Sequence, residues 1–81
     1  MPTADKLLER MRNNSRDWRI EDLLIVSKRY GIGVRKSSGS HVHFFHDDMI
    51  AHISVPAHKP IKPVYIEKFI DFLDALKEKT S

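Results

Sequence analysis

A histidine-rich segment in the middle of the chain, Gly39-Ser40-His41-Val42-His43-Phe44, holds the residues best suited to chemistry. Side chains alternate between the two faces of a β-strand, so its valine and phenylalanine are predicted on one face and its two histidines on the other. Histidine gives or takes a proton near neutral pH without a large pKa shift. Two cations that can hold a phosphate, Arg35 and Lys36, precede the segment. Together these residues suit phosphodiester chemistry, with His41 as the first candidate.

The composition is that of one small globular domain. The chain has 81 residues, of which 41% are hydrophobic and 31% charged, and we expect a single domain over residues 1–81. Because there is no cysteine, the fold must rest on packing, without disulfides or a thiolate zinc site. The start of the sequence does not resemble a signal peptide, and no apolar run approaches the length of a membrane span. We therefore expect a cytoplasmic protein with no membrane partner.

The placement of charge favours an anionic partner. The formal net charge is +3 at pH 7. Acidic residues concentrate in the segments with helical spacing, whereas the cations in the middle of the chain have few acids near them in sequence. These cations are Arg35, Lys36, Lys59 and Lys62. Their placement makes nucleic acid a stronger candidate partner than the net charge alone would.

Three helices are predicted from apolar spacing and from residues typical of helix ends. The first follows the capping residue Thr3, and we expect it to dock on the domain. The second covers residues 19–30, with Asp17 near its N-terminus and Gly31 at its C-terminal end. The third follows Pro63, which suits a first helical turn. The apolar positions are Leu7, Leu8 and Met11 in the first, Ile20, Leu23, Leu24 and Val26 in the second, and Ile66, Phe69, Ile70, Leu73 and Leu76 in the third.

Three short extended segments lie between the second and third helices, at residues 32–36, 41–46 and 50–55. Asp47 and Asp48 are predicted to form a tight turn, which makes the last two segments a hairpin. Pro56 is expected to end strand pairing because proline has no N–H to donate. In the third segment, Ala51, Ile53 and Val55 are predicted on one face, and His52 and Ser54 on the other.

The element order α-α-β-β-β-α predicts an α+β fold in which a three-stranded antiparallel sheet has one face covered by the two longer helices. The other face would be open and would carry His41, His43 and His52. This layout resembles a double-stranded-RNA-binding domain (dsRBD), with an extra short N-terminal helix.

Several segments also match a known family of bacterial proteins. An amphipathic helix ends in Gly31, and residues 39–44 contain the signature Gly-Ser-His-x-x-Phe. After the hairpin comes Val55-Pro56-Ala57-His58, and Lys62 precedes the last helix. Over roughly residues 17–77 the chain resembles the HicA toxins of HicA–HicB toxin–antitoxin systems. It departs from them at Pro63-Val64, where many members have Gly-Thr.

The resemblance implies a dsRBD-like fold and a ribosome-independent endoribonuclease that acts on mRNA. It implies a HicB-type antitoxin as partner, which would cover the active face, and it assigns the catalytic histidine to His41. Neither a cofactor nor a metal is expected. We expect the toxin alone to be a monomer that joins larger complexes with its antitoxin.

In such an enzyme His41 would deprotonate the ribose 2′-OH or protonate the leaving 5′-oxygen, in transesterification to a 2′,3′-cyclic phosphate. A second proton carrier is required, and the sequence does not name it. His43 suits either that role or RNA positioning, whereas His46 is predicted to be exposed on the opposite face. Phe45 lies on the side of His41 and is the aromatic of this strand that could stack on a base. Further RNA-binding candidates are Lys36, Lys59 and Lys62 for phosphate, Gly39 and Ser40 in the turn, and His58 in the loop.

Two other interpretations remain open at this point. A non-catalytic module of the same fold would bind double-stranded RNA with an affinity that falls with salt and does not depend on His41. A zinc protein would use His41 and His43 as ligands, with His52 or His58 as the evident additions.

Overall fold

Three helices and three strands make up the described part of the chain, residues 3–37, 39–57 and 60–80, in this computed structural model. Their order confirms the predicted α+β class and the predicted succession of elements. The elements are α1 (Ala4–Asn13), α2 (Ile20–Arg29), β1 (Gly33–Lys36), β2 (His41–Phe45), β3 (Ile53–Pro56) and α3 (Pro63–Thr80).

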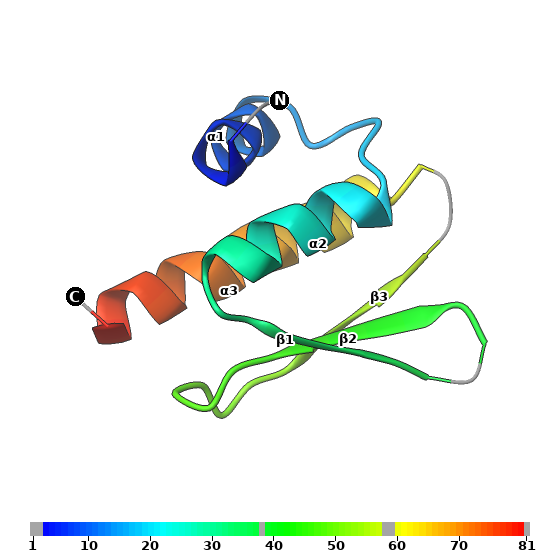
Figure 1. Ribbon diagram of the computed structural model, residues 1–81. Coiled ribbons are helices and arrows are strands. Elements are labelled where there is room, and N and C mark those ends of the chain that lie inside the picture. Colours follow the sequence, from blue (N-terminus) through cyan, green and yellow to red (C-terminus); the bar gives the residue numbers. More distant parts are fainter. Residues whose placement is uncertain (1–2, 38, 58–59, 81) are drawn as a thin grey trace.

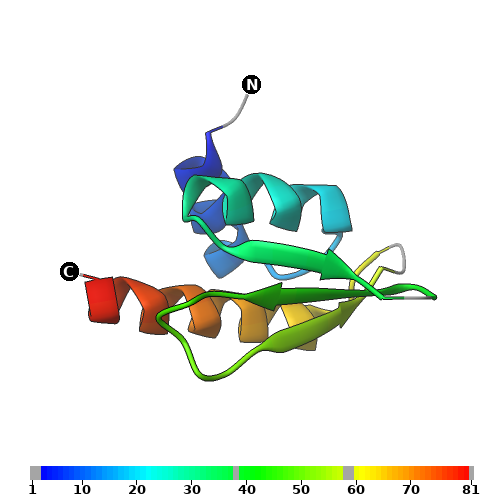
Figure 2. The same cartoon turned by 60° about the horizontal axis from the view of Figure 1, so that its bottom comes forward.

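The sheet is antiparallel, with β2 between β1 and β3. The two longer helices, α2 and α3, lie on the same side of the sheet, and no described helix lies on the other side (Figure 1). Figure 2 turns this second side toward the viewer. The predicted arrangement, with one covered face and one open face, is therefore confirmed.

Strand β2 alternates between these two faces as its sequence predicts. Val42 and Phe44 are buried on the helix side, whereas His41 is exposed and His43 is half-buried. The Phe44 ring meets the Phe69 ring of α3 edge to face, with centroids 5.3 Å apart. Such an aromatic pair contributes about 0.5–1.5 kcal/mol beyond the burial of its area. Packing of β2 against α3 thus determines which residues of β2 face outward.

Helices α2 and α3 form where their apolar spacing predicts. Pro63 is the first residue of α3, and all five predicted apolar positions of that helix are buried. After α2, Gly31 has a φ of 69°, the left-handed conformation that commonly ends an α-helix. The next residue, Ile32, donates its N–H to the carbonyl of Ser27 at 2.9 Å, which completes the predicted C-terminal end.

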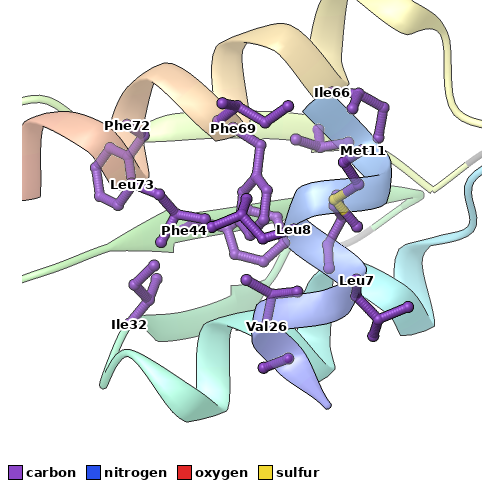
Figure 3. Packing of buried hydrophobic residues seen from close by; sticks show 14 of the residues in the cluster. Leu7, Leu8, Met11, Val26, Ile32, Phe44, Ile66, Phe69, Phe72 and Leu73 are labelled. Atoms are coloured by element: carbon purple, nitrogen blue, oxygen red, sulfur yellow. The ribbon is translucent and has the colours of Figure 1, made fainter. Parts of the chain in front are cut away.

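Helix α1 belongs to the core. The hydroxyl of Thr3 accepts a hydrogen bond from the N–H of Lys6 at 3.2 Å and caps the helix as predicted. Leu7, Leu8 and Met11 are buried, and Figure 3 shows them pointing into a cluster of side chains from α2, α3 and the sheet. The expectation that this helix docks on the domain is confirmed.

The hairpin between β2 and β3 has a longer loop than the sequence predicts. A turn does form at Asp47-Asp48, where the N–H of Met49 donates to the carbonyl of His46 at 3.0 Å. Strand β3 nevertheless begins only at Ile53, the first residue of this segment that pairs with β2, and Ile50 is 95% exposed. Ala51 and His52 therefore belong to the loop.

Pairing between β2 and β3 also extends past the predicted stop. Pro56 is the last residue of β3 and lies opposite His41, and the N–H of Ala57 donates to the carbonyl of Ser40 at 2.6 Å. An edge strand tolerates proline because its missing N–H does not interrupt a ladder on both sides.

The N-terminus of α2 differs from the prediction as well. Asp17 does not cap this helix but lies in the preceding turn with a φ of 65°. Arg19 is the capping residue, and its N–H donates to the carboxylate of Asp22 at 3.1 Å. The carbonyl of Trp18 accepts the N–H of Ile61 at 2.8 Å, which ties the start of α2 to the segment before α3.

An ion pair joins α1 to α3. Arg12 donates through Nη1 to Oδ2 of Asp74 at 2.9 Å and through Nη2 to Oδ1 of the same carboxylate. The hydrogen bond from Arg12 lowers the pKa of Asp74 below its usual range. Both side chains are about two-fifths exposed (41% and 43%), so solvent screens the pair. Exposed pairs of this kind contribute about 1 kcal/mol or less.

Apolar packing, more than this ion pair, is expected to hold α1 in place. Met11→Ala removes a fully buried side chain and should lower the free energy of unfolding by about 2–5 kcal/mol. Arg12→Ala should lower it by about 1 kcal/mol or less. Urea unfolding followed by circular dichroism measures both, and equal losses would contradict the dominance of packing.

The ion pair should also make a small, pH-dependent contribution. Because the pKa of Asp74 is lowered in the folded state, the contribution is fully present above the unfolded pKa, about 3.9. It is lost as the pH falls through the folded pKa. The stability difference between wild type and Asp74→Asn should therefore shrink on acidification below about pH 4. A difference that stays constant through that range in urea titrations would show that Asp74 is not stabilised as a carboxylate.

Candidate nucleic-acid interface

The side of the sheet without a helix, which we call the outer face, collects side chains from all three strands. Cross-strand partners share a face, so the register determines its members. His43 has Arg35 on one side and Ser54 on the other. One row along, Phe45 lies opposite Gly33, and at the other end His41 lies opposite Pro56. The sequence prediction that His41, His43 and Phe45 share one face is confirmed.

His41 is exposed at the first position of β2, and its backbone is held on both sides. Its carbonyl accepts the N–H of Ser37 at 3.2 Å and the hydroxyl of the same serine at 3.3 Å. The carbonyl of the preceding residue, Ser40, accepts the N–H of Ala57, which directly follows β3. An exposed imidazole on a fixed backbone can reach a ligand without reorganising the strand.

Gly39 supplies the turn that leads into β2. Its φ is 105°, and a Cβ placed there would meet no atom within 4 Å. Conformation, and not lack of space, therefore requires glycine at this position. Gly39 and Ser40 are both exposed beside His41, in agreement with their predicted place in the turn.

Arg35, and not Lys36, is the cation of β1 that shares the outer face. Lys36 lies opposite Val42, which is buried on the helix side, so the Lys36 side chain leaves the strand on that side. The predicted phosphate contact from Lys36 is therefore not brought beside His41. Strand alternation in the sequence is enough to predict this difference. Adjacent residues of a strand point to opposite faces, so Val34 on the helix side requires Arg35 on the outer face.

A cavity of about 180 Å³ opens on the outer face, lined by Arg35, His43, Phe45 and His52. The Phe45 and His52 rings have centroids 6.1 Å apart and planes inclined by 54°. The guanidinium carbon of Arg35 lies 5.9 Å from the centroid of the Phe45 ring, within cation–π range. The prediction that His52 shares the open face with His43 is confirmed, although His52 reaches this face from the loop before β3 and not from a strand. Arg35, named from the sequence as a cation that can hold a phosphate, lines the same cavity.

The remaining residues predicted for the site do not line the cavity on the outer face or lie outside the described part of the chain. Lys62 is exposed in the segment before α3 and does not line this cavity. His46 is half-buried, contrary to the prediction, because its Nδ1 accepts the N–H of Asp48 at 3.0 Å in the hairpin turn. His58 and Lys59 lie outside the described residues.

Larger cavities lie elsewhere, and two of them are near the connection between α1 and α2. The first, of about 420 Å³, is lined by both signs of charge, including Arg10, Arg16 and Asp22. The second, of about 370 Å³, shares Arg16 with it and adds Lys62. Among the described residues, no histidine lines either cavity.

Neither a metal cluster nor a membrane span is evident within residues 3–37, 39–57 and 60–80. No group of three or more histidine, cysteine, aspartate or glutamate side chains is arranged there to hold a metal ion. No helix in this part of the chain is both long and apolar enough to cross a bilayer. His58, one of the further ligands in the zinc interpretation, is outside these residues.

The fold and the outer face define a small α+β domain with an open sheet surface that carries histidine, arginine and an aromatic side chain. In comparisons with known proteins, no family model, curated protein or solved structure matches the chain. Its function is therefore inferred from the geometry of the outer face and from the sequence signature.

The conformation of Gly39 is expected to be costly to change. Gly39→Ala places a Cβ at a φ that L-residues rarely adopt and should lower the free energy of unfolding by about 1–2 kcal/mol. The exposed neighbour provides a control, since Ser40→Ala should change it by less than about 0.5 kcal/mol. Thermal and urea unfolding of both variants would show whether the turn before His41 depends on glycine; indistinguishable variants would mean that it does not.

Proposed function

We propose that this chain is the toxin of a HicA-type, type II toxin–antitoxin system, a ribosome-independent endoribonuclease that cleaves mRNA with His41 as its acid–base group. One observation carries the proposal. The Gly-Ser-His signature leads into β2 so that His41 is exposed on the outer face, in the strand whose next outward residue, His43, lies opposite Arg35. A proton carrier near a cation suits cleavage of an RNA phosphodiester.

The arrangement of elements supports a dsRBD-like fold as part of the same proposal. The unit α2-β1-β2-β3-α3 has both helices on one side of an antiparallel sheet. In this view α1 is an addition that completes the core on the helix side. The RNA would then lie on the outer face, which α1 does not approach (Figure 1).

The proposed reaction is an internal transesterification. His41 removes the proton of the ribose 2′-OH, and the 2′-oxygen forms a bond to phosphorus. The bond from phosphorus to the 5′-oxygen breaks, and that oxygen takes a proton from a second group. The products are a 2′,3′-cyclic phosphate and a 5′-hydroxyl, and the scheme draws on no cofactor.

His43 is well placed to be the second group. It is the next residue of β2 that faces outward, with a Cα about 6.6 Å from that of His41 by strand geometry. Arg35, directly across from His43, would stabilise the negative charge that develops on the phosphate. His43 could instead position the RNA with the same geometry. Substitution of His43 would change the pH dependence of cleavage if it donates the proton, and would not if it only positions the RNA.

The outer face also suits the proposed HicB-type antitoxin. A protein that covered this face would bury His41 and the cavity beside it, and so would exclude RNA. We propose a cytoplasmic toxin that is monomeric when free and joins a larger complex with its antitoxin.

Substitution of the proposed catalytic histidine should separate cleavage from folding. His41→Ala is expected to abolish RNA cleavage, because no exposed imidazole then occupies the start of β2, and to leave the unfolding midpoint nearly unchanged. Purified wild type and variant would be incubated with a single-stranded RNA in EDTA, and the products analysed for 2′,3′-cyclic phosphate ends. Unimpaired cleavage by His41→Ala would exclude this mechanism.

His46→Asn is the matched control, since it removes a histidine that is tied to the hairpin turn and keeps an acceptor for the N–H of Asp48. It should cleave RNA like wild type. Binding without cleavage by wild type and by His41→Ala alike would instead identify the non-catalytic module, whose affinity for double-stranded RNA falls as salt rises.

A further inference from the structure

The cavity on the outer face has a composition that points to one kind of ligand. We infer that Arg35, His43, Phe45 and His52 form a subsite for a single unpaired nucleobase of the RNA strand, stacked on Phe45. This inference rests on the proposed function, because it assigns a further part of the same RNA strand to the same face.

The size and the aromatic content of the cavity favour a planar ring. Its volume of about 180 Å³ is well below the roughly 300–1,000 Å³ of sites for drug-sized ligands. The Phe45 and His52 rings line it at 6.1 Å from one another and at an inclination of 54°, so they do not stack on each other. Phe45 is only half-buried, so part of its ring is accessible, and single-stranded RNA is commonly held by stacking of bases on aromatic side chains.

Gly33 keeps the Phe45 ring in this position. A Cβ added to Gly33 would lie 2.4 Å from two carbon atoms of that ring, so the ring rests on the glycine backbone of the neighbouring strand. An alanine there would force the ring to swing away. Gly33 has no positive φ that would require glycine for backbone reasons, which leaves close approach of the ring as its evident role.

The polar groups around the ring suit the edge of a base. The guanidinium of Arg35 is a donor only, and it lies 5.9 Å from the ring centroid. His43 and His52 each provide ring nitrogens that can donate or accept. No acidic residue lines the cavity, so an anionic strand meets no carboxylate there.

The distance from His41 assigns the subsite a role in binding. Phe45 is four residues beyond His41 on the same strand, about 13 Å by strand geometry. A base held there therefore belongs to a nucleotide next to, and not at, the phosphate that is cleaved. Because His43 and Arg35 also belong to the proposed catalytic group, the loss of stacking alone, as in Phe45→Leu, should raise Kd and KM much more than it lowers kcat.

The test measures RNA affinity separately from cleavage. A short, fluorescently labelled single-stranded RNA is titrated with full-length protein in the His41→Ala background, so that the RNA stays intact. Phe45→Leu should raise Kd by about 5- to 150-fold, the range for loss of one base–aromatic stack. Phe45→Trp should restore the affinity, and neither change should alter the dependence of Kd on salt, because no phosphate contact is lost.

Tyr65→Leu is the matched control. Tyr65 also has a cation 5.9 Å from its ring centroid, Lys68, but it lies on α3, behind the sheet. This change should leave Kd unchanged. Gly33→Ala provides a second variant, which keeps Phe45 but displaces its ring, and it should weaken binding in the same direction as Phe45→Leu.

The outcomes distinguish this subsite from the proposed nuclease. Equal affinities for Phe45→Leu, Tyr65→Leu and their parent would overturn the subsite, while cleavage by wild type would still support the nuclease. Loss of affinity in Phe45→Leu alone, with no cleavage by wild type, would support the subsite on a binding module and overturn the nuclease. An absence of any RNA binding would overturn both.

Discussion

Burial of Val42 and Phe44 against the helices is the constraint on which the functional surface depends. Side chains in a strand have a period of two, so a slip of one residue would turn the two histidines inward and expose both apolar residues. Phe44 has no exposed surface and packs on Phe69, and losing such a side chain from a core costs about 3–5 kcal/mol. The histidines face outward because the alternative register would forfeit the centre of the core.

The contribution of α1 follows from the small size of the domain. A short chain buries a small fraction of its surface, and a three-stranded sheet with two helices leaves part of its apolar layer uncovered. Leu7, Leu8 and Met11 fill that part from the helix side (Figure 3). The extra helix therefore stabilises the domain without occupying the outer face, and the site can remain open to a large ligand.

Local periodicity explains which features could be predicted from the sequence. The spacing of apolar residues in α3 and the alternation along β2 depend only on neighbours in the chain, and both are confirmed. The same alternation separates the two adjacent cations of β1, so only Arg35 lies on the outer face with the histidines. His52 lies on the predicted face, but it reaches it from the loop before β3, so its contact with Phe45 does not follow from strand alternation. That loop is tied to α3, where Lys79 Nζ donates to the carbonyl of Asp48 at 3.1 Å. No local pattern in the sequence encodes such a contact.

Charge is distributed differently on the outer face and on the helices, which the net charge alone does not show. Most carboxylates lie on the helices, among lysine and arginine side chains, and Asp74 is paired there with Arg12. By register, the outward residues of the three strands include Arg35 and two histidines but no acid. An approaching polyanion therefore meets cationic side chains without carboxylates on the strands, whereas both signs of charge are interspersed on the helices. In the proposed function, an RNA strand bound on the sheet would meet His41 and the aromatic cavity together.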